Sequence, residues 1–366
     1  MPPRFLQAMR ILFCNDSFPG HFEPLAAYFA SDPANEVLFA SRYERRAFSI
    51  PGVRRVQFRA PKERNAVRDP LINDWAKAAD LGRKALESFL QIRNIGFTPD
   101  IVLYSAGNGV SLFLERAFPD AFRAAYLDNS VNIMAEEADS RTIALMVQGL
   151  SLFESHRAYA FSTKQRDAFP PILRPSIGII PLSVNTEFFN REAASPFFCN
   201  EEEKVAPKEM VSFSIKGEVS IGLLRVIAAL LARRQDCHAM LSCGTAQNAK
   251  LIRHAMAGLG PERLSRLHIC DFLQRSTYRD MLCSSAVHVC PQRTNTLLVE
   301  HLEAMSSGPV LMTPAPASPL ALKPGNNMAM WPDKPQDQFN MICRLLDNEQ
   351  VRKQIAAQAR QTVLSG

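Results

Sequence analysis

Short apolar runs alternate with longer helical patterns along the chain. The first run, Arg10–Asn15, ends in a turn and is followed by a helical pattern over Phe22–Ala30. Short apolar runs are typical of strands that are buried on both faces, and apolar residues at helical spacing, as over Pro70–Asn94, indicate helices. The alternation continues to the last helical pattern, Glu349–Val363. Among the elements that it predicts are a helix over Ser111–Ala117 and strands over Phe122–Leu127, Ile177–Leu182 and Leu267–Cys270. It predicts parallel sheets that are covered by helices on both faces.

One segment interrupts this alternation. Residues 183–207 contain several asparagines, a Ser-Pro pair and the acidic run Glu201–Glu203, a composition that is typical of a linker. We therefore predict an N-terminal Rossmann-like domain over residues 1–182 and a C-terminal one over residues 208–366, whose last helix packs back on the first domain. The predicted fold class is α/β, with two doubly wound domains that face each other across a ligand cleft.

Composition supports a two-domain globular protein. The chain has 366 residues and a 47% apolar fraction, which suggests two domains of roughly 150 residues or more. Its formal net charge is +6 without a long basic run, so we expect no nucleic-acid partner. No stretch approaches the ~18 apolar residues of a membrane span, and the start does not read as a secretory signal. We expect a cytoplasmic protein, with peripheral contact at the inner face of a membrane left open.

The eight cysteines include no C-x-x-C pair, which favours reduced thiols and argues against a zinc site. On one predicted helix Glu300 and Glu303 share a face and His301 points elsewhere, so we expect no metal there either. In a doubly wound sheet, ligands bind beyond the carboxyl ends of the strands. That rule selects three loops of the first domain: Asn15–His21, Ser105–Gly109 and Asp128–Asn132.

Motifs in both halves occur in a recognisable order. They are Arg10–Ala26, Gly96–Leu103, Phe161–Pro170, Ile180–Phe188, Ser285–Val289 and Leu302–Val310. Together they resemble bacterial glycosyltransferases of family 4, which have the GT-B fold. The resemblance implies a retaining transfer of a sugar from a nucleotide-sugar donor, with UDP or GDP as its nucleotide, to a glycan, lipid-linked or protein acceptor. It implies no cofactor and no metal.

The resemblance also implies a donor site in the second domain. Glu303 matches the family's second donor-site glutamate, which is expected to hold the ribose hydroxyls, whereas Asn295 stands where the family has the first. Thr294, Asn295 and Thr296 precede the helix of Glu303, where backbone N–H groups can bind a diphosphate. Lys216 is the one phosphate-binding cation that remains. Further donor contacts are expected at Gly244, Phe272 and Leu273.

In the first domain the resemblance implies the acceptor side and the reaction centre. Gly20 lies in the turn that approaches donor and acceptor, and the neighbouring His21 is expected to act as a neutral imidazole. Ser105 occupies the position where relatives carry a histidine, and Asn108 replaces an aromatic residue. Asp128 is the acidic candidate after the run Phe122–Leu127. We take His21, Ser105 and Asp128 as the candidate catalytic residues.

Two other functions remain open. Because Asn295, Ser105 and a missing second phosphate cation depart from the family pattern, the chain could be a catalytically degenerate binding or scaffold subunit of a glycosylation system. An epimerase on the same fold would need acid and base carboxylates that the sequence does not place. The oligomeric state is not predicted.

Overall fold

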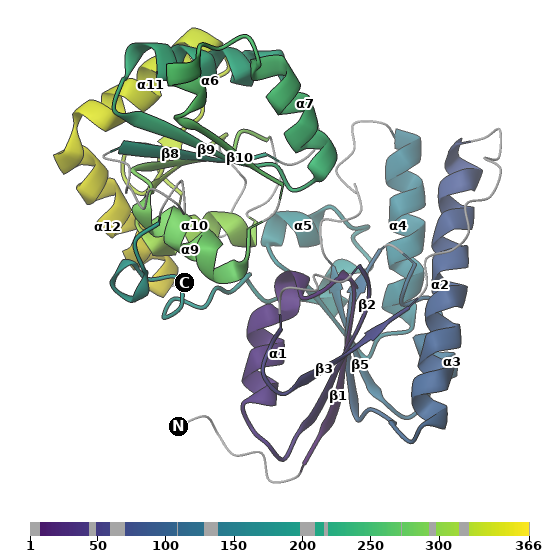
Figure 1. Ribbon diagram of the computed structural model, residues 1–366. Helices are drawn as coiled ribbons and strands as arrows, with labels where there is room; N and C mark the ends of the chain where they lie inside the picture. The colour runs from purple at the N-terminus through teal and green to yellow at the C-terminus, as the bar shows by residue number, and fades with distance from the viewer. Residues whose placement is uncertain are drawn as a thin grey trace. The chain divides into compact units, whose positions relative to one another are not determined.

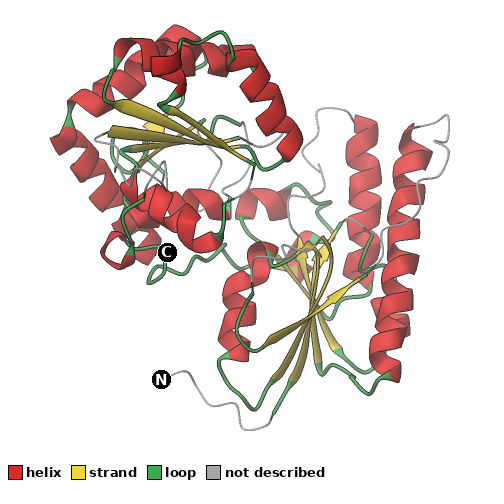
Figure 2. Cartoon of the chain, in the orientation of Figure 1, coloured by secondary structure: helices red, strands yellow, loops and turns green. Residues whose placement is uncertain are grey.

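The computed structural model of the protein describes residues 8–43, 49–58, 70–107, 109–127, 138–197, 209–215, 219–271, 273–292, 298–314 and 322–365; the side chains of residues 70, 71, 74 and 138–144 are not among them. The chain forms two compact units, Met1–Leu182 and Ser183–Gly366. Each unit contains one parallel sheet between layers of helices (Figure 1, Figure 2).

The sheet of the first unit has seven parallel strands in the order β3-β2-β1-β4-β5-β6-β7. Alternate residues of β1 face opposite sides: Leu12 and Cys14 pack in one buried cluster, and Ile11 and Phe13 in another. Both clusters are apolar, as a sheet covered on both faces requires. The strands are β1 (Arg10–Ser17), β2 (Glu36–Tyr43), β3 (Val53–Gln57), β4 (Ile101–Ala106), β5 (Phe122–Leu127), β6 (Arg157–Ala160) and β7 (Ile177–Ile179).

Helices cover both faces of this sheet. Helices α2 (Pro70–Asn94), α3 (Leu114–Ala117) and α4 (Ala138–Phe153) lie on one face, and α1 (Glu23–Ala30) lies on the other (Figure 1). The remaining helices are α5 (Thr163–Asp167) and the short 3-10 turns η1 (Gly20–Phe22) and η2 (Arg174–Ser176). Helix α1 directly follows η1, the turn that contains the candidate site residues Gly20 and His21.

The second unit repeats this architecture with six parallel strands in the order β10-β9-β8-β11-β12-β13. The central strand β8 pairs with both β9 and β11, so the carboxyl ends of these three strands lie at one edge of the sheet. The strands are β8 (Glu209–Ser214), β9 (Cys237–Ser242), β10 (Leu267–Cys270), β11 (Val287–Val289), β12 (Val310–Thr313) and β13 (Ala329–Met330).

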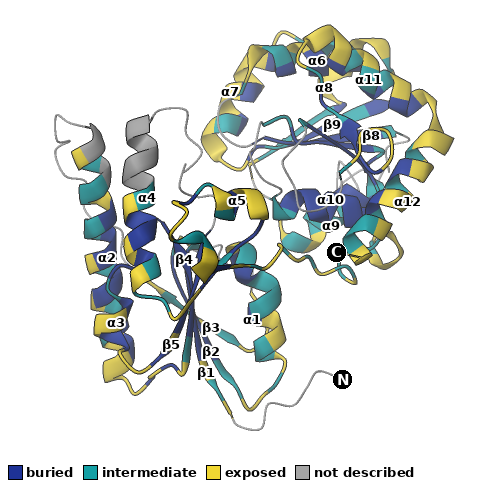
Figure 3. Cartoon of the chain, turned by 180° about the vertical axis from the view of Figure 1, so that it is seen from behind, coloured by how far each residue is buried: buried dark blue, intermediate teal, exposed yellow. Residues whose placement is uncertain are grey.

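Two helical layers enclose the second sheet. Helices α6 (Ile221–Arg233), α7 (Ala246–Met256) and α11 (Pro335–Asp347) pack on one face, and α9 (Arg275–Ser284), α10 (Val299–Ser307) and α12 (Glu349–Ser365) on the other. Helix α10 is buried over Glu300–Ser307, which Figure 3 shows in dark blue. Helix α8 (Pro261–Leu264) and the turn η3 (Arg191–Ala193) complete the unit.

The predicted linker is partly built into the second unit. Its described residues, Ser183–Phe197, belong to that unit, and residues 198–207 lie outside the described ranges. Arg360 of α12 donates to the carbonyls of Thr186 and Phe189, and Arg191 donates to that of Cys283. Helix α12 packs against α10, α11 and β12 of its own unit. Hydrogen bonds from Arg360 and Arg191 thus tie the start of this segment to the rest of the second unit.

Most predicted elements are present, with corrections at their ends. The predicted helix Ser111–Ala117 is shorter, Leu114–Ala117, and the predicted strand Ile177–Leu182 stops at Ile179. Helix α5 is missing from the prediction because its five residues, Thr163–Asp167, are polar and short, so they carry no periodicity. No helix among the described residues is long and apolar enough to cross a membrane.

Candidate functional site

The carboxyl ends of β8, β9 and β10 meet at one edge of the second sheet. The N–H of Ile215 donates to the carbonyl of Ser242 at 2.8 Å, and that of Cys243 donates to the carbonyl of Cys270 at 2.9 Å. Gly244 follows with φ +68°, and a Cβ there would lie 3.6 Å from the carbonyl oxygen of Ile215. The exposed glycine thus leaves backbone accessible at the edge where ligands of such sheets bind.

Several predicted donor residues follow the ends of these strands in the sequence. Lys216 follows Ile215 directly and Phe272 follows Asp271, but both lie outside the described residues. Leu273 is described: it is half-buried and packs with the apolar cluster of α9, α10 and Phe189. This packing is structural and leaves a contact of Leu273 with a nucleotide base as a prediction.

Glu303 is a buried carboxylate on α10. Its side chain is 6% exposed, and Arg275, the first residue of α9, donates from Nη1 to its Oε1 at 2.6 Å. A buried carboxylate is stable in the ionised form only with a cation or several donors beside it. Arg275 supplies such a cation, and its guanidinium Cζ lies 4.6 Å from the centre of the Phe189 ring.

Aromatic residues surround this ion pair. The rings of Phe189 and Tyr278 meet edge to face at 6.4 Å. Burial, followed by the charges of Glu303 and Glu300, raises the pKa of Tyr278 well above its usual value, so its phenol stays protonated. Helices α9 and α10 therefore bring the Arg275–Glu303 ion pair next to the protonated phenol of Tyr278.

A second polar cluster lies at the start of α10. The donor atoms of Cys290, Glu300 and His301 lie within 4.8 Å of one another, which corrects the prediction that His301 points away from Glu300. The N–H of Leu298 donates to Nδ1 of His301 at 3.2 Å. That bond uses the lone pair of Nδ1, so a neutral ring carries its proton on Nε2. A metal ion binds a ring nitrogen through a lone pair, and in this tautomer neither nitrogen has one to spare. The cluster is therefore better suited to capping α10 than to holding a metal.

In the first unit, Gly20 and His21 occupy the turn after β1. Gly20 has φ +55°, and a Cβ there would lie 2.1 Å from Nδ2 of Asn15, so both conformation and space require glycine. The half-buried His21 ring lies 5.0 Å from the Phe161 ring and 6.0 Å from the Tyr126 ring, centre to centre. Its imidazole thus stands at the carboxyl ends of β5 and β6.

Of the other catalytic candidates, Ser105 is buried and Asp128 lies outside the described residues. Ser105 lies inside β4 and is 1% exposed. It is therefore enclosed by the core, whereas a catalytic side chain is expected to be exposed to its ligand. Asp128 and Asn108 lie outside the described residues, as do Thr294, Asn295 and Thr296. The roles assigned to these residues remain predictions.

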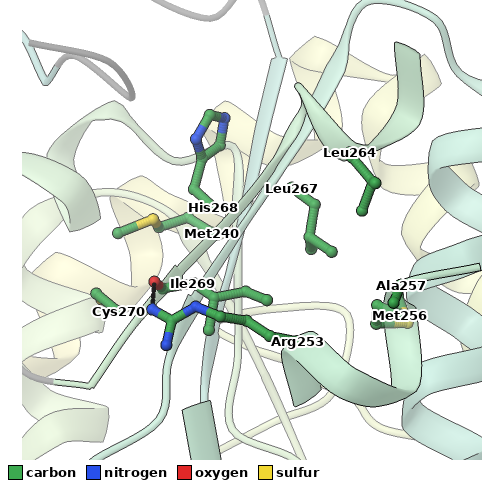
Figure 4. A pocket seen from close by; sticks show the side chains of 9 residues that line it. All are labelled: Met240, Arg253, Met256, Ala257, Leu264, Leu267, His268, Ile269 and Cys270. Carbon is green, nitrogen blue, oxygen red and sulfur yellow. Dashed lines mark hydrogen bonds between the residues drawn. The ribbon is translucent and has the colours of Figure 1, made fainter. Parts of the chain in front are cut away.

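A pocket of about 640 Å³ runs along the edge strand β10 (Figure 4). It is lined mostly by apolar residues of β10, α7 and α8, together with Arg253 and His268. Arg253 reaches from α7 to the carbonyl of Ile269 at 2.8 Å (Figure 4). Neither Gly244 nor Glu303 is among the described residues that line it, whereas Cys270, at the carboxyl end of β10, is.

The sequence alone did not pair Arg275 with Glu303. The two residues are 28 positions apart, and no local sequence pattern joins them. The available signal is that Arg275 begins a helix that follows the strand β10.

Comparisons with known proteins agree with this architecture. Residues 33–189 match the family model described as "Glycosyl transferase family 4 group". Sucrose-phosphate synthase from Thermosynechococcus elongatus is 14% identical with a TM-score of 0.68, over 98% of this chain and 94% of that one. The HepE protein of Anabaena, solved with UDP-glucose, is 16% identical with a TM-score of 0.68, over 98% and 95%.

A UDP-N-acetylglucosamine 2-epimerase is also similar, with 13% identity and a TM-score of 0.61, over 98% of this chain and 95% of that one. The comparison with curated proteins gives no match. At these identities the solved structures establish the fold, and the family match covers most of the first unit. Residues 33–189 thus match the model of the glycosyl transferase family 4 group, and the chain as a whole has the GT-B fold of two Rossmann-like units.

Proposed function

We propose that this protein transfers a sugar from a nucleotide-sugar donor to a glycan, lipid-linked or protein acceptor, with retention of configuration and without a metal ion. The observation that carries the proposal is the buried Glu303 carboxylate on α10, which pairs with Arg275 of α9. A carboxylate accepts hydrogen bonds from two vicinal hydroxyls, which suits the ribose of a nucleotide.

The chemistry divides between the two units. In the second unit, Lys216 and the backbone N–H groups of residues 294–296 would stabilise the negative charge that develops on the leaving diphosphate. Gly244, Phe272 and Leu273 would contact the rest of the nucleotide. In the first unit, His21, Ser105 and Asp128 are the proposed catalytic residues, and Gly20 is a proposed donor contact. The solved relative with UDP-glucose makes UDP the first nucleotide to test.

The test is calorimetry with UDP, GDP and their sugar conjugates in the absence of metal. We expect micromolar binding of one nucleotide by the wild type and its loss in Glu303→Ala. Glu262→Ala, which removes an exposed carboxylate of the same unit, is the control and should bind as the wild type does. If no nucleotide binds to the wild type, the proposal is wrong.

A degenerate binding subunit is the second candidate, because Asn295 replaces the first donor-site glutamate. It predicts nucleotide-sugar binding without turnover. Release of free sugar or nucleotide from the bound donor, measured over hours with the wild type and Glu303→Ala, separates the two: release by the wild type alone favours the enzyme.

A further inference from the structure

The Arg275–Glu303 ion pair is a well-enclosed charge pair of the candidate donor site. Glu303 is 6% exposed and Arg275 is 21% exposed, and the distance from Nη1 to Oε1 is 2.6 Å. An ion pair at the surface contributes little, whereas removing one partner of a buried pair leaves an uncompensated charge. The protonation state of Glu303 therefore depends on Arg275.

The position of Arg275 is itself fixed from the other side. Its guanidinium lies against the ring of Phe189, which is fully buried. The carbonyl of Phe189 accepts hydrogen bonds from Ser306 Oγ at 2.7 Å and from Arg360 Nη1 at 3.1 Å. Ser306 lies one turn beyond Glu303 on α10. The ring, the guanidinium and the carboxylate thus form one packed stack between the segment 183–197, α9 and α10.

We propose that Arg275 is a positioning residue for the nucleotide-sugar donor: it holds Glu303 ionised and oriented so that the carboxylate accepts the ribose hydroxyls. This inference rests on the proposed function. A carboxylate oxygen has two lone pairs, so Oε1 can accept from Arg275 and from a hydroxyl together. Without the cation, a carboxyl at this depth takes up a proton more readily and loses acceptor capacity.

Helix α9 offers a matched control one turn farther along. The guanidinium of Arg279 lies 4.7 Å from the centre of the Phe188 ring, and its Nη2 pairs with Asp280 at 2.7 Å. Arg275 and Arg279 therefore both stack on a phenylalanine of the same segment and both pair with a carboxylate. Only Arg275 reaches Glu303.

The experiment measures the affinity for the nucleotide that the wild type binds, between pH 6 and pH 8, in Arg275→Ala, Arg275→Lys and Arg279→Ala. We expect Arg275→Ala to lower the affinity by about 10- to 100-fold, as for truncation of one partner of a buried charge pair. The ratio of wild-type to variant affinity should grow as the pH falls, because a buried carboxyl that has lost its cation takes up a proton more readily. Arg275→Lys should restore part of the affinity, since the charge remains but the planar fork is lost.

Two further variants keep the inference testable. In a Glu303→Gln background, Arg275→Ala should change the affinity by less than about 3-fold, because the carboxylate through which Arg275 acts is absent. If Arg275→Ala fails to fold in a thermal melt, Arg275→Gln replaces it in the pH series. Wild-type affinity of the Arg275 variants across this pH range, with binding lost in Glu303→Gln, would overturn the inference and leave the proposed function intact. No binding by the wild type would instead refute the proposed function.

Discussion

Nδ1 of His288 lies 2.8 Å from Oγ of Ser212, on adjacent strands at the centre of the second sheet. Ser212 Oγ also lies 2.8 Å from Oγ of Ser285, which donates to the carbonyl of Met281 at 2.7 Å. The three polar side chains are fully or almost fully buried. They form a small hydrogen-bonded chain inside the second unit, and this chain makes the unit sensitive to acid.

Burial, with a smaller effect of the nearby His301, lowers the pKa of His288 to about 3. An unfolded histidine titrates near 6.5, so between these values the unfolded state binds the extra proton. The stability due to neutral His288 is complete above pH 6.5 and is lost as the pH falls towards 3. In chemical denaturation, His288→Gln should show a slope against pH that is shallower by up to about 1.4 kcal/mol per pH unit.

The turn after β1 should tolerate no side chain at Gly20. Gly20→Ala combines a positive φ with a contact of 2.1 Å to Asn15 Nδ2, whereas Gly96 has φ +92° and open space around it. We expect Gly20→Ala to lower the free energy of unfolding by about 2–4 kcal/mol and Gly96→Ala by about 1 kcal/mol, since the second change carries backbone strain alone. Urea denaturation of both variants measures the difference. Equal effects would show that the turn around Asn15 relaxes.

Arg266 should contribute to stability through its geometry as well as its charge. It is 8% exposed, and it donates to the carbonyls of Leu231 at 2.8 Å, Arg234 at 2.6 Å and Cys237 at 3.1 Å. Lysine cannot reach several carbonyls with one ammonium group, so Arg266→Lys should cost about 2–3 kcal/mol. The same change at the exposed Arg263 is the comparison, and its effect on the unfolding midpoint should be within error.

The thiols of the folded protein should react slowly. Of the seven cysteines described, all are free and five are buried, with Cys270 and Cys343 half-buried. Burial raises the pKa of Cys237 to about 12 and that of Cys243 to about 11, so their thiolates are scarce at pH 8. In a Cys199→Ser background, a disulfide reagent should modify the five buried thiols only after denaturant is added. Rapid reaction of all seven in the native protein would contradict the burial.

The local pattern was sufficient for most elements of both sheets. The strands Phe122–Leu127 and Leu267–Cys270 and the helix Pro70–Asn94 have the predicted limits, because each is a run with one clear period between turn residues. Short polar elements such as α5 and α8 were not predicted, since their sequences carry no period and their tertiary contacts stabilise them. The resemblance of ordered motifs predicted the GT-B fold, which the solved relatives support.

The candidate site was predicted by residue type and completed by the tertiary structure. Glu303 is recognisable because a carboxylate stands in an apolar helix, and Gly20 because a turn follows a buried strand. That Ser105 is enclosed in the core could not be read from its loop-end position. Nor could the proximity of Cys290, Glu300 and His301, since a strand end and a helix start that lie ten residues apart meet only in the folded sheet.

The sequence by itself determined the strand–helix alternation, the two halves and the residue types at the carboxyl ends of the strands, because these depend on local periodicity and turn chemistry. Only the tertiary structure decided that Arg275 pairs with Glu303 against Phe189, and that His288 is neutral beside Ser212. Charge state and orientation depend on burial and on neighbours from distant segments, and no local pattern encodes either. That is why the pairing of Arg275 with Glu303 emerged only from the folded second unit.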